Sequence, residues 1–205
     1  RYVHLGGYSE GREPMRATTT AIAGLTGDQQ RRFSAYCVKL TYPMFHAIAS
    51  YADEEPKELI SLVSGLVDEL WEGKPVRRSD GSDRLTVVKA MLQLLPHADD
   101  AAYPEYYQSC FLNVLVGAVV AATHDPKDGA ISALTETINL IEAALSYVHA
   151  GEANAAIDEL FGRLDAFLEE EVGDRARLEL NLARSAVPGM APKLREKLWA
   201  TDPRT

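Results

Sequence analysis

One stretch of the sequence, from Cys110 to Ala122, restricts what this chain can fold into. It reads CFLNVLVGAVVAA, and Asn113 carries its only polar side chain apart from the thiol of Cys110. A helix that is apolar on every side cannot lie on a surface and has to be surrounded by other elements. The run, at about 13 residues, is shorter than the roughly 20 that a bilayer-spanning helix needs. The sequence therefore predicts a buried central helix, over about residues 103–123, in a protein that does not interact with a membrane.

Apolar residues at helical spacing predict further helices on both sides of this run. Thr26 and Gln29 have the spacing of a capping box at the start of a helix. Pro43 should interrupt that helix, because proline removes a backbone donor and disfavours helical geometry at Tyr42. Pro188 and Gly189 should separate the last two helices. The remaining helices are expected over residues 56–71, 83–95, 126–148, 157–168, 175–186 and 192–199.

The segment 126–148 carries a heptad-like apolar seam. Its members are Ile131, Leu134, Ile138, Ile141, Leu145 and Val148, at spacings of three and four. This seam is typical of a helical hairpin, here with residues 157–168, and it also permits a symmetric homodimer. No segment shows sustained strand alternation. We therefore predict an all-α, compact multi-helix bundle with a C-terminal helical hairpin.

The predicted domain organisation is an N-terminal arm over residues 1–25 followed by a single helical domain over residues 26–205. Residues 1–14 are rich in Gly and Tyr and lack periodicity. Two interpretations stay open for them: a remnant of cloning or read-through ahead of a natural start at Met15, or an ordered arm of the native protein.

The net charge and the cysteine content indicate which binding partners and which cellular compartment to expect for this protein. The net charge of −9 argues against nucleic-acid binding, which needs a concentrated basic surface, and is compatible with a basic protein partner. Cys37 and Cys110 lie in apolar helical patterns, which predicts two buried thiols rather than a disulfide. The chain does not open on a signal-peptide pattern. A cytoplasmic protein is expected.

Two acidic loops flank the central run and contain the residue types that bind metals. One holds His97, Asp99 and Asp100, and the other His124, Asp125 and Asp128. A helix of about 20 residues between them would keep the loops about 30 Å apart. Each loop alone lacks the spacing of a known metal motif. Helix capping is the favoured role for these aspartates, and no metal or cofactor is predicted.

Three tyrosines, Tyr103, Tyr106 and Tyr107, open the central helix. Their hydroxyls need partners if they are buried, so they are candidates for lining a pocket, although a structural role is favoured. The sequence contains no G-x-S-x-G elbow, P-loop or G-x-G-x-x-G, and neither cysteine has a histidine at a diagnostic spacing. No catalytic residue is assigned.

Several short motifs resemble one known family. They are Tyr42-Pro43 after the Cys37 segment, Trp71-Glu72 at a helix end, Pro96 with Asp99-Asp100, and the tyrosine-rich entry to the helix bearing Cys110. In order and spacing these resemble the YjaG-like family of bacterial all-helical proteins, whose function is not assigned. The resemblance spans residues 28–150 and implies a compact helical bundle, without catalytic residues to transfer. The chain departs from the family pattern at Ser109, where an acidic residue commonly precedes the cysteine, and in the more basic loop 74–83.

The sequence thus favours a non-enzymatic protein that binds another protein, with an antitoxin-like, immunity-like or adaptor role. The alternative hypothesis is an enzyme or small-molecule sensor with a pocket between helices, dependent on a metal held by the Asp99–Asp100 loop.

Overall fold

The computed structural model describes residues 13–49, 57–74, 84–95, 98–148, 162, 168 and 174–201. Over these residues the chain forms eight helices and no strand, which confirms the all-α class. The helices are α1 (Glu13–Gly24), α2 (Gly27–Ala49), α3 (Lys57–Trp71), α4 (Arg84–Leu94), α5 (Pro104–Thr123), α6 (Pro126–Val148), α8 (Arg175–Arg184) and α9 (Val187–Thr201).

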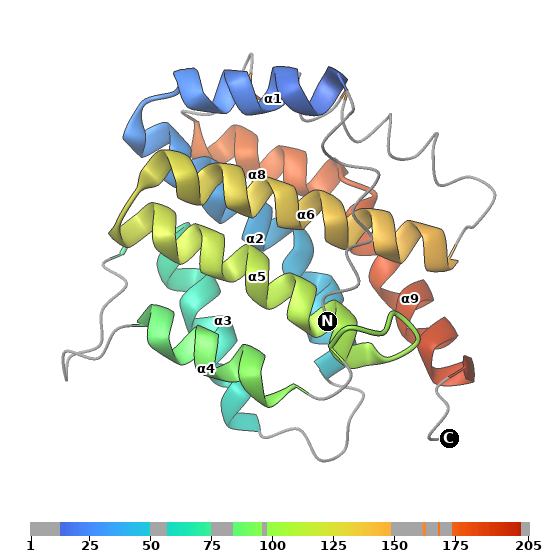
Figure 1. Cartoon of the computed structure of the whole chain (residues 1–205). Helices are drawn as coiled ribbons and strands as arrows, with labels where there is room; N and C mark the ends of the chain where they lie inside the picture. Colours follow the sequence, from blue (N-terminus) through green and yellow to red (C-terminus); the bar gives the residue numbers. More distant parts are fainter. Residues whose placement is uncertain are drawn as a thin grey trace.

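Two helices organise the bundle. In Figure 1, α5 lies between α6 and α4, and α2 passes behind α5 and α6. α5 contacts α2, α3, α4 and α6, whereas α2 contacts α3, α5, α6, α8 and α9. The core is therefore built mainly on α2, α5 and α6, with the other helices packed around them.

The predicted central helix is confirmed in α5. Twelve of its twenty residues are buried, and none of the others is fully exposed. Phe111 stacks on Phe45 of α2, with 4.8 Å between ring centroids. Among the described helices, α5 alone is long and apolar enough to cross a membrane by composition, and core helices of globular bundles share this property.

Small residues let α5 and α6 approach each other very closely. A Cβ added to Gly117 would lie 2.6 Å from the backbone nitrogen of Ala133, and one added to Gly129 would lie 2.2 Å from that of Ala121. The pairs Gly117–Ala121 and Gly129–Ala133 each place two small residues one turn apart on facing helix surfaces. This pattern of small residues, which is not among the sequence-based predictions, fixes the crossing of the two helices.

The expected interruption at Pro43 is wrong, because α2 continues from Gly27 to Ala49 with Pro43 inside it. Proline in a helix interior costs about 3 kcal/mol or more. Large apolar side chains are buried on both sides of Pro43, namely Phe33, Leu40, Met44, Phe45 and Ile48. Their burial at roughly 1.5–3 kcal/mol per large side chain outweighs the local cost.

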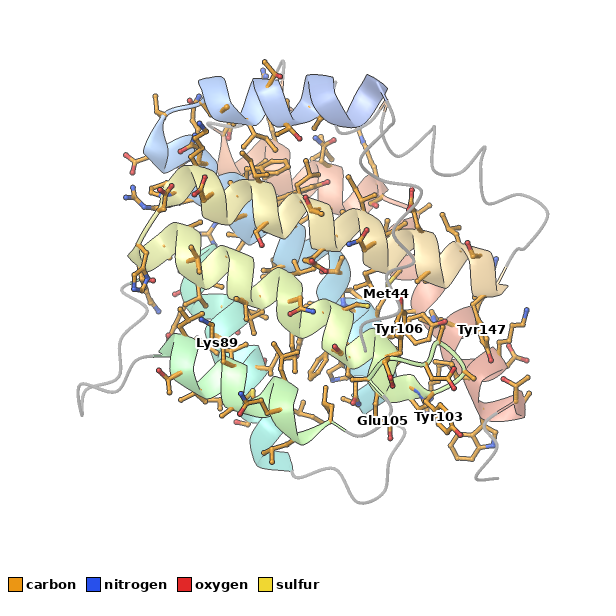
Figure 2. All side chains as sticks on the ribbon, in the orientation of Figure 1. Met44, Lys89, Tyr103, Glu105, Tyr106 and Tyr147 are labelled. Carbon is orange, nitrogen blue, oxygen red and sulfur yellow. The ribbon has the colours of Figure 1, made fainter. Side chains whose placement is uncertain are left out.

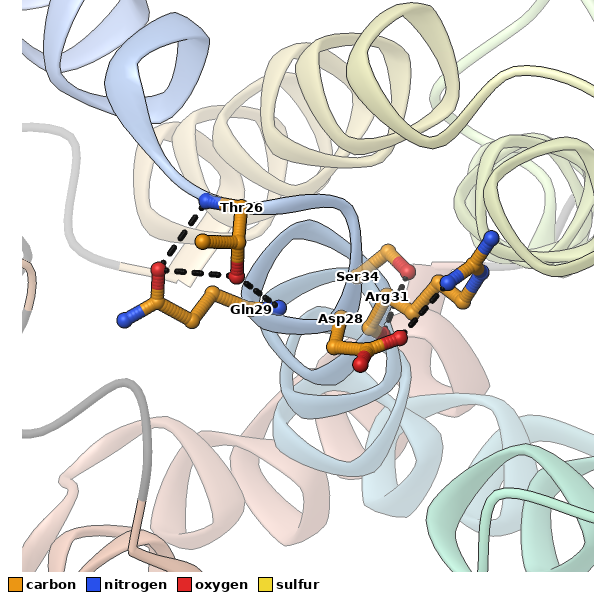
Figure 3. A network of polar contacts seen from close by, with 5 residues as sticks. All are labelled: Thr26, Asp28, Gln29, Arg31 and Ser34. Atoms are coloured by element: carbon orange, nitrogen blue, oxygen red, sulfur yellow. Dashed lines mark hydrogen bonds and ion pairs between the residues drawn. The ribbon is translucent and has the colours of Figure 1, made fainter.

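The ends of several helices agree with the sequence-based predictions, unlike the expected interruption at Pro43. The Thr26 backbone N–H donates to Gln29 Oε1 at 3.0 Å, and the Gln29 N–H donates to Thr26 Oγ1 at 3.3 Å, which confirms the capping box (Figure 3). Asp125 Oδ1 accepts from the Asp128 N–H at 3.0 Å and caps α6, as predicted. Gly73 has a φ of 67° and ends α3, with its N–H donating to the Leu70 carbonyl.

Two further segments differ from the sequence-based expectations. Residues 13–24, assigned to an N-terminal arm, form α1, which packs on α6 and buries Ile22 completely. Pro188 and Gly189 do not separate the last two helices, because α9 already begins at Val187. Proline is tolerated in the first turn of a helix, because an N–H at that position has no acceptor within the helix. The Val187 N–H, at the start of α9, donates to Ser185 Oγ.

The buried face of α6 is wider than the predicted seam, which takes only two positions from each heptad. Leu134, Ile138, Ile141 and Leu145 are buried, as expected, whereas Ile131 and Val148 are only half-buried. The buried residues outside the predicted seam include Ala130, Ala133, Thr137, Leu140 and Ala144. α6 needs this wider face because it packs on α2 and α5 together. The second helix of the predicted hairpin, over residues 157–168, lies almost entirely outside the described residues.

Candidate functional site

Four tyrosines gather where the N-terminal end of α5 meets the C-terminal end of α6. We call Tyr103, Tyr106, Tyr107 and Tyr147 the tyrosine cluster. The ring centroids of Tyr106 and Tyr107 are 5.2 Å apart in an edge-on arrangement, and those of Tyr107 and Tyr147 are 6.1 Å apart. Figure 2 shows Tyr103, Tyr106 and Tyr147 at this end of the bundle, together with Glu105.

The members of the cluster differ in burial. Tyr107 is fully buried, and its hydroxyl donates to the Ala101 carbonyl at 3.1 Å. Burial raises the pKa of Tyr107 well above its usual range, and the neighbouring tyrosines add to this. Tyr103, Tyr106 and Tyr147 are half-buried. Tyr107 therefore anchors the cluster in the core, while the other three present part of their rings to the surface.

Tyr106 interacts with the Cys110 thiol on its own helix and with the charge of Glu136 on α6. Burial raises the pKa of Tyr106 to about 12, with further contributions from Cys110, to which its hydroxyl is hydrogen-bonded, and from Glu136. Burial and the charge of Glu136 likewise raise the pKa of Cys110 to about 12. A thiol with such a pKa is protonated at neutral pH and is a poor nucleophile.

Glu136, near the middle of α6, is a half-buried carboxylate, as are Glu105 and Glu142. Burial raises the pKa of Glu136, and a hydrogen bond from the Asn139 side chain partly opposes that rise. Glu136 follows Ala133 by one helical turn, and Ala133 packs directly on α5. Within the described ranges, no lysine or arginine forms an ion pair with Glu136.

The C-terminal helix is fastened to the same end of the bundle. Lys197 of α9 donates from Nζ to the Tyr147 backbone carbonyl, and its Nζ lies 5.2 Å from the centroid of the Tyr147 ring. The Tyr147 hydroxyl is hydrogen-bonded to the hydroxyl of Thr201. A cation at the last turn of α6 also suits the negative end of the helix dipole. This arrangement shows that an ammonium group is accommodated on a tyrosine face of the cluster.

The loop proposed as a weak metal site has a structural role in the described part. Asp100 Oδ1 accepts from the Ala102 N–H at 2.9 Å, and the Asp100 carbonyl accepts from the Tyr103 N–H at 3.0 Å. Asp99 is exposed. The residue at the N-cap of α5 is Tyr103 rather than either aspartate. His97 lies outside the described residues, and among those described no group of three or more His, Cys, Asp or Glu side chains could hold a metal ion.

The second acidic loop lies at the opposite end of α5, as the helix length predicted. Asp125 caps α6, and the His124 Nδ1 lies 2.5 Å from the hydroxyl of Thr123. Figure 1 shows the turn between α5 and α6 far from the entry to α5. The structure therefore does not bring the two sets of candidate ligands together.

Cys37 and Cys110 are both buried free thiols, as predicted. Cys37 is completely enclosed between α2 and α6, beside the hydroxyl of Thr137, and burial raises its pKa to about 12. Neither cysteine has the electropositive, accessible surroundings that activate a thiol.

Sequence reasoning missed Glu136, Tyr147 and Lys197 as members of this region. Glu136 could have been noticed as an acidic residue next to the apolar seam of residues 131–148, where a charge has to sit at the edge of a buried face. No local pattern could have brought Lys197 to Tyr147, because the two residues are 50 positions apart.

Fold and site together define an all-α helical bundle with an aromatic, acidic surface at one end. Comparison with protein-family models, with curated proteins and with solved structures gave no significant match. The resemblance to the YjaG-like family therefore stays a prediction from the sequence.

Proposed function

We propose that this chain is a non-enzymatic protein-binding module that receives its partner at the tyrosine cluster. The observation that carries the proposal is the grouping of three half-exposed tyrosines at one end of the bundle, with Tyr103 at the N-cap of α5, Tyr106 in α5 and Tyr147 in α6. Tyrosine is enriched in protein interfaces because its ring supplies a large contact area at little entropic cost, while its hydroxyl stays solvated.

The chemistry of the same region favours binding over catalysis. The thiol of Cys110 and the phenols of Tyr106 and Tyr107 all have raised pKa values, so they stay protonated at neutral pH. A general base or nucleophile needs a group that loses its proton near the working pH. An antitoxin-like, immunity-like or adaptor role fits a surface that presents aromatic contacts in this way.

Position-specific crosslinking tests the proposal. A photoreactive phenylalanine derivative replaces Tyr103, a member of the cluster, and in a second variant it replaces Lys89, an exposed residue on α4. Both variants are irradiated in lysate of the source cells and the adducts are identified by mass spectrometry. We expect a discrete protein adduct from position 103 that is absent from position 89. The proposal is overturned if position 103 gives no adduct, or if both positions give the same set.

A further inference from the structure

We propose that the outer face of α4 is a homodimer interface, on which two copies of the chain pair through antiparallel α4 helices. This face lies outside the tyrosine cluster, so the inference goes beyond the proposed function and is tested separately from it. It is carried by a helix that is apolar on most of its circumference although it lies at the edge of the bundle (Figure 1).

The apolar surface of α4 exceeds what its packing in the bundle uses. Between residues 85 and 94, only Thr86, Lys89 and Gln93 have polar side chains. Leu85 and Val88 are buried, and α5 is the described helix that supplies the main contact of α4. A helix at the edge of a bundle normally has one apolar stripe and a polar opposite face, whereas a helix that is apolar nearly all round is covered on both sides. The outer side of α4 therefore has the composition of a covered surface.

The apolar residues on this outer side form one line along the helix. Val87 is half-buried, Ala90 is exposed, and Leu94 is 81% exposed, the largest exposure among the large hydrophobic side chains described. Their spacings of three and four residues place them on the same side of α4. A single exposed leucine is ordinary in a folded protein, whereas a continuous apolar line on an exposed helix marks an interaction surface.

The order of these residues makes the line complementary to itself. An isologous dimer places the same surface of each copy on a two-fold axis. With that axis between Ala90 and Met91, Val87 of one copy lies opposite Leu94 of the other, and the same contact occurs twice. The small side chain of Ala90 lies beside the axis, where it allows the two helices to approach closely. The line thus fits a second α4 in antiparallel orientation.

The charge of the chain selects a second copy as the occupant of this face. Each copy carries a net charge of −9, so two copies attract each other only across a face without carboxylates. Lys89 is the single charged residue between residues 85 and 94, and the neighbouring α5 has none from Tyr106 to Thr123. Two copies can therefore meet here without opposing their negative charges. A strongly basic or acidic partner would find little charge to complement on this face.

Sedimentation velocity of the full chain, from about 5 to 500 µM, tests the proposal. α4 has 11 residues and is about 16 Å long. The contact is therefore smaller than a standard interface, and we expect a dimer dissociation constant of about 10–100 µM. Leu94→Glu should weaken self-association at least about tenfold, because it places a carboxylate against the apolar line of the other copy. Ala183→Glu is the matched control, since it adds the same charge at an exposed position on α8, and it should change self-association less than about twofold.

The antiparallel register is tested with a cysteine beside the two-fold axis. Ala90→Cys should give an intermolecular disulfide under mild oxidation with copper–phenanthroline in air, because the axis brings the two thiols close together. Ala183→Cys, treated in the same way, should stay largely uncrosslinked. The native Cys37 and Cys110 are buried and do not compete. Circular dichroism of each variant shows that the helices are retained.

The proposal is overturned if the parent chain stays monomeric up to 500 µM, or if Leu94→Glu leaves the dimer intact. It is also overturned if Leu94→Glu and Ala183→Glu weaken self-association equally, since that would indicate a general effect of added charge. None of these results bears on the adduct expected at Tyr103. A crosslink between two copies formed at Lys89 has twice the mass of the chain and is thereby distinguished from a partner adduct.

Discussion

The pKa values of several single residues in this bundle are set mainly by how deeply the side chains are buried. The two thiols, two of the tyrosines and Glu136 all have raised pKa values, and burial is the largest cause in each case. For an acid, burial disfavours the charged form, so these groups hold their protons more strongly than they do in an unfolded chain.

Glu136 should therefore lower stability at neutral pH. Its folded pKa is raised, so between its ordinary and its raised pKa the folded chain binds more protons than the unfolded chain, and stability falls as the pH rises through this window. We expect Glu136→Gln to increase the free energy of unfolding at pH 7, by less than about 1 kcal/mol because the side chain is half-exposed. Urea unfolding at pH 7 and at pH 4 measures this. A gain of equal size at both pH values would contradict the assignment.

The thiols of Cys37 and Cys110 should resist alkylation in the folded protein. Burial raises both pKa values to about 12, so the reactive thiolate is scarce at pH 8. We expect iodoacetamide to modify both residues at least about a hundredfold more slowly in buffer than in urea, followed by peptide mass spectrometry. Rapid modification of Cys110 in buffer would show that the tyrosine cluster opens more readily than its burial suggests.

At the scale of elements, the contact between α5 and α6 depends on two glycines. Gly129 meets the backbone of Ala121, and Gly117 meets that of Ala133, at distances that leave no room for a Cβ atom. Backbone atoms cannot swing aside as the end of a long side chain can, so any added atom separates the helices.

Gly129→Ala should destabilise the protein by about 2 kcal/mol or more, because overpacking outweighs the helix propensity gained. Gly65→Ala is the control. Gly65 lies in α3, is exposed, and has no atom within 4 Å of an added Cβ. This variant should gain about 0.5–1 kcal/mol. Thermal unfolding of both variants supplies the comparison, and a stabilised Gly129→Ala would mean that α5 and α6 are not in close contact.

The whole molecule is connected through α2, which contacts α3, α5, α6, α8 and α9. The aromatic stack of Phe45 on Phe111 and the hydrogen bond from Gln30 to the Ile22 carbonyl tie α2 to α5 and to α1. Few of these helices could leave the bundle without exposing the core, so the helices should unfold together.

The chain's two tryptophans report on this cooperativity. Trp71 ends α3, whereas Trp199 lies in α9. We expect the single-tryptophan variants Trp71→Phe and Trp199→Phe, followed by fluorescence in urea, to give coincident unfolding transitions after correction for any shared shift in stability. Separate midpoints would show that the C-terminal helices form an independent unit, contrary to the predicted single domain.

The sequence by itself determined the class of fold, the central position of α5 and several helix ends. These depend on interactions between residues a few positions apart: helical periodicity, the Thr26–Gln29 capping box, and the Asp125 cap. The tertiary structure decided the rest. It carried α2 through Pro43, because burial on several helices outweighed a local cost. It also brought Tyr107, Tyr147 and Lys197 together at one end of the bundle, since contacts between distant residues follow from how helices pack rather than from any local pattern.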